Sequence, residues 1–459
     1  MAARAPGERE ALFAATLASF LTPFMGSATN VALPAIGREL ALDAVSLSWI
    51  STAYLLSAAV FLVPLGKLAD IHGRKRTFVA GLLIFTATSL LCAAAPTAGL
   101  LLAARVVQGI GGAMIFGTSI ALLSSVFPPG RRGRALGINV TAVYLGLTLG
   151  PFLGGVLTEQ LGWRSVFLAN VVLGALATAV AARGLAGEWT GAAGERLDVA
   201  GSILYGGGLA ALMAGLGRLP DAVGGLLVAA GLAGLLAFVS WELRVAHPVL
   251  DMTLFRDNRV FACSNLAALI QYAATFAVGF LLSLQLQYVD GLSAQAAGAL
   301  LAVQPLVQAA VSPFAGRLSD QLDSRLVASA GMAVVAVGLA LLGGGVAARH
   351  VFLVACLALL GVGFGLFSSP NTNAVMASVT PRSYGVAAAT LATMRLVGQM
   401  LSMGVAGLVL AAFVGHEAVT PARHAALVAA VRTTFGLFSL LCALGTFASL
   451  ARGRTATAA

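Results

Sequence analysis

The stretch Gly66-Lys67-Leu68-Ala69-Asp70-Ile71-His72-Gly73-Arg74-Lys75-Arg76 is a dense cluster of charges between two long apolar runs. The run 47–65 precedes it and the run 77–95 follows it. Each run is about as long as the roughly 20 residues that a helix needs to cross a bilayer. The stretch therefore predicts a tight loop that joins two membrane-spanning helices.

Individual residues of this loop predict more than a turn. Gly66 leaves room for a neighbouring helix, and Gly73 can take the positive φ that ends a helix. Asp70 places a carboxylate at the negative end of a helix dipole, where it needs an arginine or a helix N-terminus to stabilise it. An ordinary basic loop on the cytoplasmic side would explain the run 74–76, but it leaves Gly66 and Asp70 unexplained.

The composition extends this pattern to the whole chain. Of its 459 residues, 59% are hydrophobic and only 10% are charged, against about 25% charge in a soluble domain. We therefore expect an all-α polytopic membrane protein with about 14 transmembrane helices. The apolar runs begin near Ala11, Leu47, Thr77, Ala98, Gly133, Trp163, Leu197, Ala222, Val260, Ala294, Ser324, Val351, Gly385 and Ala425.

The distribution of charge predicts the orientation. Nineteen of the 27 Lys and Arg residues fall on the side of the loop 66–76, which the positive-inside rule assigns to the cytoplasm together with both termini. The basic residues are spread over short loops, so the net charge of +10 indicates membrane orientation rather than a nucleic-acid partner. An excess of arginine over lysine and many alanines and glycines favour the inner membrane of a bacterial cell.

The second half of the chain repeats the first. Gly316-Arg317-Leu318-Ser319-Asp320 echoes residues 66–70 at an offset of 250, and Gly398 echoes Gly146 at an offset of 252. Parallel repeats of this kind build many transporters. Asp323 replaces the closing glycine in the echo, so we expect that second loop to be the weaker of the two.

The repeat suggests three parts. Residues 1–183 are expected to form an N-terminal six-helix bundle, and residues 260–459 a C-terminal one. Residues 184–259 are expected to hold cytoplasmic linkers and an extra, peripheral helix pair. The four cysteines fall inside apolar spans without metal-ligand spacing, so we expect no cofactor and no metal ion.

The loop 66–76 resembles the signature between helices 2 and 3 of the major facilitator superfamily. The resemblance implies two bundles that expose a site to alternate sides of the membrane. It also implies that Asp70 and Arg74, with Gly66 and Gly73, latch the halves on the cytoplasmic side when the outer side is open. Gly316 and Asp320 would form the corresponding weaker latch.

Two further motifs narrow the resemblance to the fourteen-helix drug:proton antiporter branch. The run Asn30-Val31-Ala32-Leu33-Pro34 is similar to that branch's helix 1 signature, but Met25 stands where the branch usually has an aspartate. The run Gly146-x-x-x-Gly150-Pro151-x-x-Gly154-Gly155 resembles its antiporter signature. Glycines four apart also fit plain close helix packing, but beside the other motifs the run favours export.

Polar residues at membrane depth are the candidate substrate contacts. A membrane arginine is costly and marks a functional site by default, although polar groups can also simply bond neighbouring helices. Arg105 is open to this second interpretation because it lies near one end of its helix. The candidates for the cavity are Asn30, Arg105, Gln108, Gln271, Gln304, Gln308, Asn371, Arg395 and Gln399. Tyr272 and Asn373 are further polar residues at membrane depth.

The charges at membrane depth predict the polarity of the substrate. None of the 17 acidic residues and none of the 5 histidines falls in the middle third of a span, whereas Arg395 lies roughly 15 Å deep. We therefore expect a positive potential there and a neutral or anionic amphipathic substrate. With no carboxylate at mid-membrane, Asp70 is a candidate for coupling to protons.

These observations favour a monomeric transporter that exports small amphipathic molecules by alternating access, with protons as the counter-ion. A uniporter or importer of an organic anion or metabolite is the alternative, because Met25 weakens the case for antiport. A membrane enzyme would need clustered His, Asp or Glu, and a sensor would usually carry a soluble domain. The sequence shows neither feature.

Overall fold

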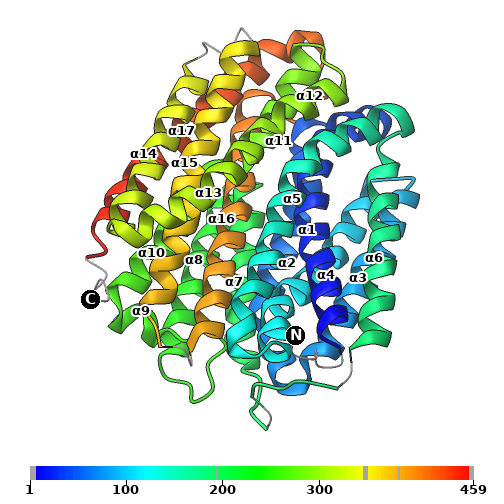
Figure 1. Ribbon diagram of the computed structural model, residues 1–459. Coiled ribbons are helices and arrows are strands. Elements are labelled where there is room, and N and C mark those ends of the chain that lie inside the picture. Colours follow the sequence, from blue (N-terminus) through cyan, green and yellow to red (C-terminus); the bar gives the residue numbers. More distant parts are fainter. Residues whose placement is uncertain (1–6, 186, 193, 345–349, 381–382, 454–459) are drawn as a thin grey trace.

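The computed structural model describes residues 7–185, 187–192, 194–344, 350–380 and 383–453 (Figure 1). Fourteen helical spans in this part of the chain are long and apolar enough to cross a membrane, which confirms the predicted number. The helices are α1 (Glu8–Glu39), α2 (Ala44–His72), α3 (Arg74–Ala94), α4 (Ala98–Val126), α5 (Pro129–Leu161), α6 (Arg164–Gly184), α7 (Val199–Leu216), α8 (Ala222–Glu242), α9 (Thr253–Asp257), α10 (Arg259–Thr275), α11 (Ala277–Leu284), η1 (Gln285–Val289), α12 (Ala294–Leu301), α13 (Val303–Gln321), α14 (Ser324–Gly343), α15 (His350–Ala377), α16 (Tyr384–Phe413), η4 (Pro421–Arg423) and α17 (His424–Leu450).

Two groups of helices stand side by side. Helices α1 to α6 form one group and α10 to α17 the other (Figure 1). Elements α10, α11 and η1 together make one span, and so do α12 and α13. Because the number of spans is even, the chain enters and leaves at the same end, which also carries the loop 66–76. We call this the loop end and the other the far end.

Glycines build the same close contacts in both groups. A Cβ atom on Gly146 of α5 would lie 2.5 Å from the carbonyl oxygen of Phe20 on α1. A Cβ atom on Gly398 of α16 would lie 2.5 Å from the carbonyl oxygen of Leu269 on α10. Real Cβ atoms do not come this close, so both positions require glycine. The internal repeat predicted from the sequence is therefore also a repeat of packing.

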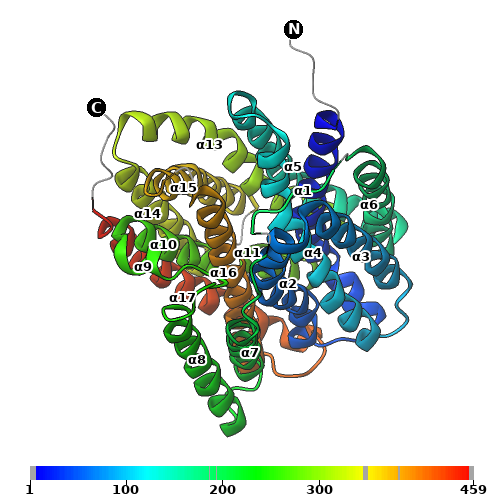
Figure 2. The same cartoon turned by 90° about the horizontal axis from the view of Figure 1, so that it is seen from below.

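Of the extra helix pair, which was expected to be peripheral, only α8 is so. Helix α8 lies outermost (Figure 2) and leaves Leu226 and Leu236 about seven-tenths exposed, as a lipid-facing helix would. Helix α7 instead contacts both groups. Tyr205 of α7 donates a hydrogen bond to the Ala59 carbonyl of α2 at 3.1 Å. On its other side, α7 packs against α16 of the second group. Helix α7 therefore lies along one edge of the seam between the two groups.

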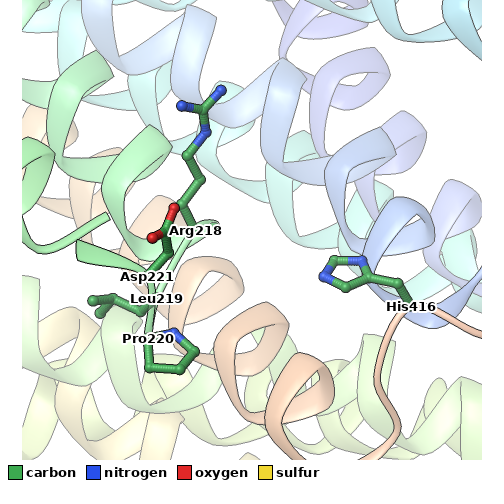
Figure 3. Close-up of a pocket in the computed structure, with 6 residues that line it drawn as sticks. Arg218, Leu219, Pro220, Asp221 and His416 are labelled. Atoms are coloured by element: carbon green, nitrogen blue, oxygen red, sulfur yellow. The ribbon is translucent and has the colours of Figure 1, made fainter. Parts of the chain in front are cut away.

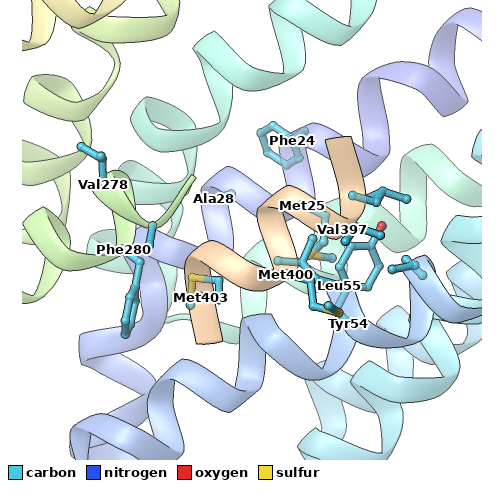
Figure 4. Packing of buried hydrophobic residues seen from close by; sticks show 14 of the residues in the cluster. Phe24, Met25, Ala28, Tyr54, Leu55, Val278, Phe280, Val397, Met400 and Met403 are labelled. Atoms are coloured by element: carbon cyan, nitrogen blue, oxygen red, sulfur yellow. The ribbon is translucent and has the colours of Figure 1, made fainter. Parts of the chain in front are cut away.

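The seam is closed at the far end. Gln287 Nε2 donates to the Val31 carbonyl at 2.9 Å, and Tyr288 donates to the Pro34 carbonyl at 3.2 Å. Buried apolar side chains of α1, α2, α11 and α16 belong to one continuous cluster that spans the seam (Figure 4). The two halves are thus held together by hydrogen bonds at the far end and by apolar packing deeper in the membrane.

Candidate functional site

The loop 66–76 has the local geometry that its sequence predicts. Gly73 has a φ of +130°, which confirms the predicted positive φ. Arg74 Nε lies 2.7 Å from Asp70 Oδ1, and Arg74 Nη1 donates to Ser125 Oγ of α4 at 2.7 Å. The carboxylate at the end of α2 is therefore stabilised by an arginine, as its position on the helix dipole requires.

The linker between α6 and α7 binds this loop. The Glu188 carboxylate accepts hydrogen bonds from the backbone N–H groups of Lys75 at 2.7 Å and Arg76 at 3.1 Å, at the start of α3. Lys67 pairs with Glu195 at 2.6 Å and thereby lowers the pKa of that carboxyl group. Among the described residues, none on α10 to α17 hydrogen-bonds or ion-pairs with Asp70 or Arg74. The loop is held by its own half and by the linker.

The glycine that opens the loop faces free space. A Cβ atom on Gly66 would have no atom within 4 Å, although Gly117 of α4 approaches its backbone from another side. On the repeat, a Cβ atom on Gly316 would meet only Ser369 Oγ, at 3.0 Å. The side chain of Asp320 lies outside the described part of the chain. In this conformation, therefore, no described residue lies close to Gly66 in the direction in which a side chain would point.

The glycine run on α5 provides packing in two directions. A Cβ atom on Gly150 would clash with Ser27 of α1, within the same group. A Cβ atom on Gly155 would lie 2.4 Å from the Ala294 carbonyl of α12, across the seam, and Gly298 of α12 packs against Pro151. The run thus holds α5 against its own bundle and against the other one at the far end.

Arg105 belongs to a closed network inside the first group. It is 1% exposed, and its Nε donates to the Ile50 carbonyl at 3.1 Å. Its Nη1 donates to Gln108 Oε1 at 2.5 Å, and Gln108 in turn donates to Ser89 Oγ at 2.8 Å. The guanidinium stacks 4.5 Å from the Tyr54 ring centroid. Helices α2, α3 and α4 are joined by this network.

Four other predicted cavity residues are also buried within one group. Asn30 accepts a hydrogen bond from Ser51 at 2.9 Å. Asn371 donates to the Ser264 carbonyl at 3.1 Å, and Cys442 donates to Gln271 at 3.2 Å. Gln308 is 5% exposed on α13. Sequence reasoning places these residues correctly at membrane depth, and the structure surrounds them with protein.

Arg395 has a different setting. It is half-buried on α16, and its Nη2 donates to Thr372 Oγ1 of α15 at 2.8 Å. Its Cζ atom lies 5.7 Å from the ring centroid of Tyr272 on α10. Gln399, one turn further along α16, and Gln304 on α13 are half-buried as well. The structure therefore separates the partly open candidates from the sealed ones.

Sequence reasoning missed several residues next to Arg395. Tyr144 of α5 and Ser368 of α15 approach to 3.1 Å across the seam, and Thr372 donates to the Ser368 carbonyl at 2.8 Å. Thr372 stands between two asparagines that sequence analysis selected, so its position was a usable signal. Lone hydroxyl groups such as those of Tyr144 and Ser368 give no such signal.

Arg452 is a second residue that sequence reasoning missed. It is 1% exposed after the end of α17, and its Nη1 donates to Asn371 Oδ1 at 3.0 Å and to Ser264 Oγ at 3.1 Å. Its place near the C-terminus made it look like a solvated tail residue. It instead anchors the end of α17 to α10 and α15.

The position of the missing aspartate is filled by packing. Met25 is fully buried, and Thr29 donates to its sulfur atom at 3.3 Å. Asn170 of α6 lies 3.9 Å from the same sulfur atom. The site therefore holds a well-packed thioether with no group that titrates.

An open cavity of about 640 Å³ lies at one end of the bundle. It is lined by the hairpin between α7 and α8 and by His416 after α16, with Arg218 and Asp221 on the hairpin (Figure 3). Arg395 lies in the middle of α16, whereas this cavity begins beyond the end of that helix. The cavity and the Arg395 residues are therefore separate features.

The two repeated groups of spans, the seam between them and the polar residues beside it define a class of membrane protein built from two parallel six-helix repeats. Comparisons with known proteins agree. Residues 15–196 and 265–458 match the Major Facilitator Superfamily. The chain belongs to this superfamily of transporters.

Relatives in sequence include transporters and export proteins. The chain is 30% identical to the riboflavin transporter RibZ of Clostridioides difficile, over 82% of each chain. It is 32% identical to the multidrug resistance protein Stp of Mycobacterium tuberculosis, over 88% of this chain and 76% of Stp. It is 36% identical to the cephamycin export protein CmcT of Amycolatopsis lactamdurans, over 86% and 83%. These names confirm the resemblance to multidrug efflux members.

The fold also matches a solved structure. A bacterial homologue of the human lysosomal transporter Spinster, in an inward-facing and unoccupied conformation, superposes with a TM-score of 0.71. The match covers 98% of both chains at 17% sequence identity. It shows that the two chains share a fold.

Proposed function

We propose that this transporter exports small amphipathic organic molecules by alternating access, in exchange for protons. The observation that carries the proposal is the pairing of a seam closed at the far end with a half-buried arginine beside that seam. A site between two rocking repeats is the arrangement that alternating access requires. Relatives named for multidrug resistance and export support the direction.

The orientation follows from the charge asymmetry of the loops. The positive-inside rule assigns the loop end and both termini to the cytoplasm of the cell, at the inner membrane. The conformation described here is then closed toward the outside. The loop 66–76, for which the described residues of the second half offer no hydrogen bond or ion pair to Asp70 or Arg74, is then in its released state.

Proton coupling needs a group that titrates. Met25 cannot serve, and among the described spans no carboxylate lies in the middle third of a helix. We propose that Asp70 has this role, because its carboxylate pairs with Arg74 and its backbone carbonyl accepts hydrogen bonds from Gly191 and Ala192 of the linker. Protonation of Asp70 would weaken its pairing with Arg74 and so change the strength of the gate.

A uniporter or importer of a metabolite is the second candidate function. The observation in its favour is Met25, together with the riboflavin transporter among the relatives. In this case the loop 66–76 would act as a gate without any role for protons.

Inside-out vesicles with an imposed pH gradient would test the proposal. Fluorescein, riboflavin and rhodamine 123 would be added in turn, and the gradient would be followed with a pH-sensitive dye. Substrate-dependent collapse of the gradient, absent from vesicles without the protein, is expected. Uptake of a compound without any change in the gradient would favour uniport. In that outcome, an Asp70→Asn variant should retain the wild-type pH dependence.

A further inference from the structure

Arg395 carries a charge that the protein does not neutralise. Its Nη2 has the Thr372 hydroxyl as partner, and its Nε is buried without any hydrogen-bond partner. No acidic residue within the described part of the chain forms an ion pair with it. An uncompensated cation at membrane depth is costly, so its retention indicates a partner from outside the protein.

The contacts of Arg395 are with helices of its own half, close to the seam. The residue lies roughly 15 Å along α16, near the middle of a bilayer core about 30 Å thick. It packs toward Tyr272 on α10 and Thr372 on α15, both of which are themselves half-buried. Tyr144 of the other half contacts Ser368 one turn from Thr372, so this group of side chains borders the seam.

An aromatic wall stands next to the cation. The rings of Tyr272 and Phe364 meet edge to face with centroids 5.2 Å apart, and Phe364 meets Phe367 at 6.5 Å. Phe364 and Phe367 are buried and support Tyr272, which is the partly exposed ring of the three. Aromatic side chains with a few convergent polar groups are typical of small-molecule sites. Ring faces and edges of this kind stack well against a flat aromatic ligand.

We infer that Arg395 and Tyr272 bind an aromatic amphiphile that carries an anionic group, with the anion on the guanidinium and the ring against Tyr272. This inference rests on the proposed transport function and adds the substrate class. A positive site in a medium of low dielectric attracts an anion strongly and repels a lipophilic cation. Thr372 is a positioning residue, because its hydroxyl group accepts a hydrogen bond from Nη2 and so fixes the orientation of the guanidinium.

The competing explanation is that Arg395 only ties α16 to α10 and α15. Arg105 shows what such a tying arginine looks like in this protein. It is 1% exposed, donates to a carbonyl and an amide oxygen, and has a ring stacked on it at 4.5 Å. Arg395 is half-buried, has one hydroxyl partner, and lies 5.7 Å from its ring. The weaker anchoring favours a role in binding.

Two dyes with the same xanthene ring system and opposite charge give a direct test. Fluorescein is anionic and rhodamine 123 is cationic. Binding of each to the detergent-purified protein would be measured by fluorescence anisotropy. We expect the wild type to prefer fluorescein. Arg395→Gln should weaken fluorescein binding about tenfold, the loss of one charge-assisted pair, and Arg395→Lys should recover part of it.

Arg134→Gln is the matched control, since Arg134 is exposed on α5 and its loss changes the net charge equally. It should bind both dyes as the wild type does, and size-exclusion profiles should show that all variants are folded. Unchanged fluorescein binding in folded Arg395→Gln would overturn the inference. So would a wild-type protein that prefers rhodamine 123 or binds neither dye. Transport is assayed separately in proteoliposomes, so preserved binding without transport would instead contradict the proposed function.

Discussion

The two membrane arginines differ in what surrounds them. Arg105 lies in the first half, where α2, α3 and α4 supply a carbonyl, an amide and a ring, and its whole network is buried. Arg395 lies in the second half, where one hydroxyl and a more distant ring leave its Nε without a partner. A buried polar group is stabilised when its hydrogen bonds are made, so the guanidinium of Arg105, with two oxygen partners, is better satisfied than that of Arg395, with one.

The difference teaches that an arginine at membrane depth is not by itself a binding site. The helix packing of the two halves repeats closely. A Cβ atom on Gly109 would lie 2.5 Å from the Tyr54 carbonyl, and one on Gly361 would lie 2.5 Å from the Gln304 carbonyl. The two arginines do not occupy equivalent helices of this repeat, since Arg105 lies on α4 and Arg395 on α16, the counterpart of α5. The side chains around each arginine, rather than the helix packing, therefore make the difference between the two regions.

The largest expected effect is the loss of Arg105. Arg105→Gln should lower the free energy of unfolding by about 3 kcal/mol, because it removes the hydrogen bonds to Ile50 and Gln108 and leaves the Gln108 side-chain oxygen buried without its partner. Thermal denaturation of the purified protein measures this, with Arg395→Gln as the comparison and an expected loss below about 1 kcal/mol. Equal losses in the two variants would mean that both arginines are structural.

A second prediction tests whether the two halves are packed alike. Gly109→Ala and Gly361→Ala should each lower the stability by about 1–3 kcal/mol, since each new methyl group would overlap a backbone carbonyl. Gly66→Ala is the matched control, because its methyl group would meet nothing within 4 Å. Thermal denaturation again gives the measurement. A loss in only one of the two variants would show that packing, and not only side-chain pairing, distinguishes the halves.

A third prediction concerns the positioning of Arg395. Thr372→Val keeps the shape of the side chain but removes the acceptor for Nη2, so fluorescein affinity should fall about fivefold, or roughly 1 kcal/mol. The melting temperature should stay at the wild-type value. Thr372→Ser retains the hydroxyl group and should bind the dye normally. Wild-type affinity in Thr372→Val would remove Thr372 from the site.

The smallest expected effect lies outside both regions, in the partly exposed pair Lys67 and Glu195. Glu195→Gln should cost less than about 1 kcal/mol at neutral pH. Lys67 lowers the pKa of Glu195 below its ordinary value of 4.5, so the pair contributes stability above that pH and loses it as the pH falls through the folded-state pKa. Melting curves of wild type and variant should therefore converge in acid. A loss as large as that of Arg105→Gln would show that charge rather than burial sets these effects.

Much of the fold was predictable because the bilayer restricts the choice. Long apolar runs in hydrocarbon must be helices, so the 14 spans and the repeat could be read from the order of residues. The positive φ of Gly73 and the pairing of Asp70 with Arg74 were predictable for a local reason, since both partners lie within five residues of each other. The contact of α7 with both halves was not expected, because it depends on which helices are neighbours.

The sequence indicated which polar residues lie inside the spans, but not which partners they hydrogen-bond. Sequence analysis selected Arg105 and Arg395 on equal terms, because each is a charge inside an apolar run. Arg105 bonds a carbonyl of α2 that lies 55 positions away in the sequence, and Arg395 bonds a hydroxyl of α15 that lies 23 positions away. Such pairings depend on which helices are neighbours in space. Arg452 shows the same effect, since a residue of the C-terminal tail bonds Ser264.

The sequence by itself thus determined the class of protein, the number of spans, the repeat and the local geometry of the loop 66–76. Hydrophobic length, loop charge and the conformational freedom of glycine act over a few residues or along one helix, so they are legible in one dimension. The tertiary structure alone decided which polar groups are satisfied. Burial and hydrogen bonding are properties of neighbours in space, and only the assembled helices close the network around Arg105 and leave the one around Arg395 open.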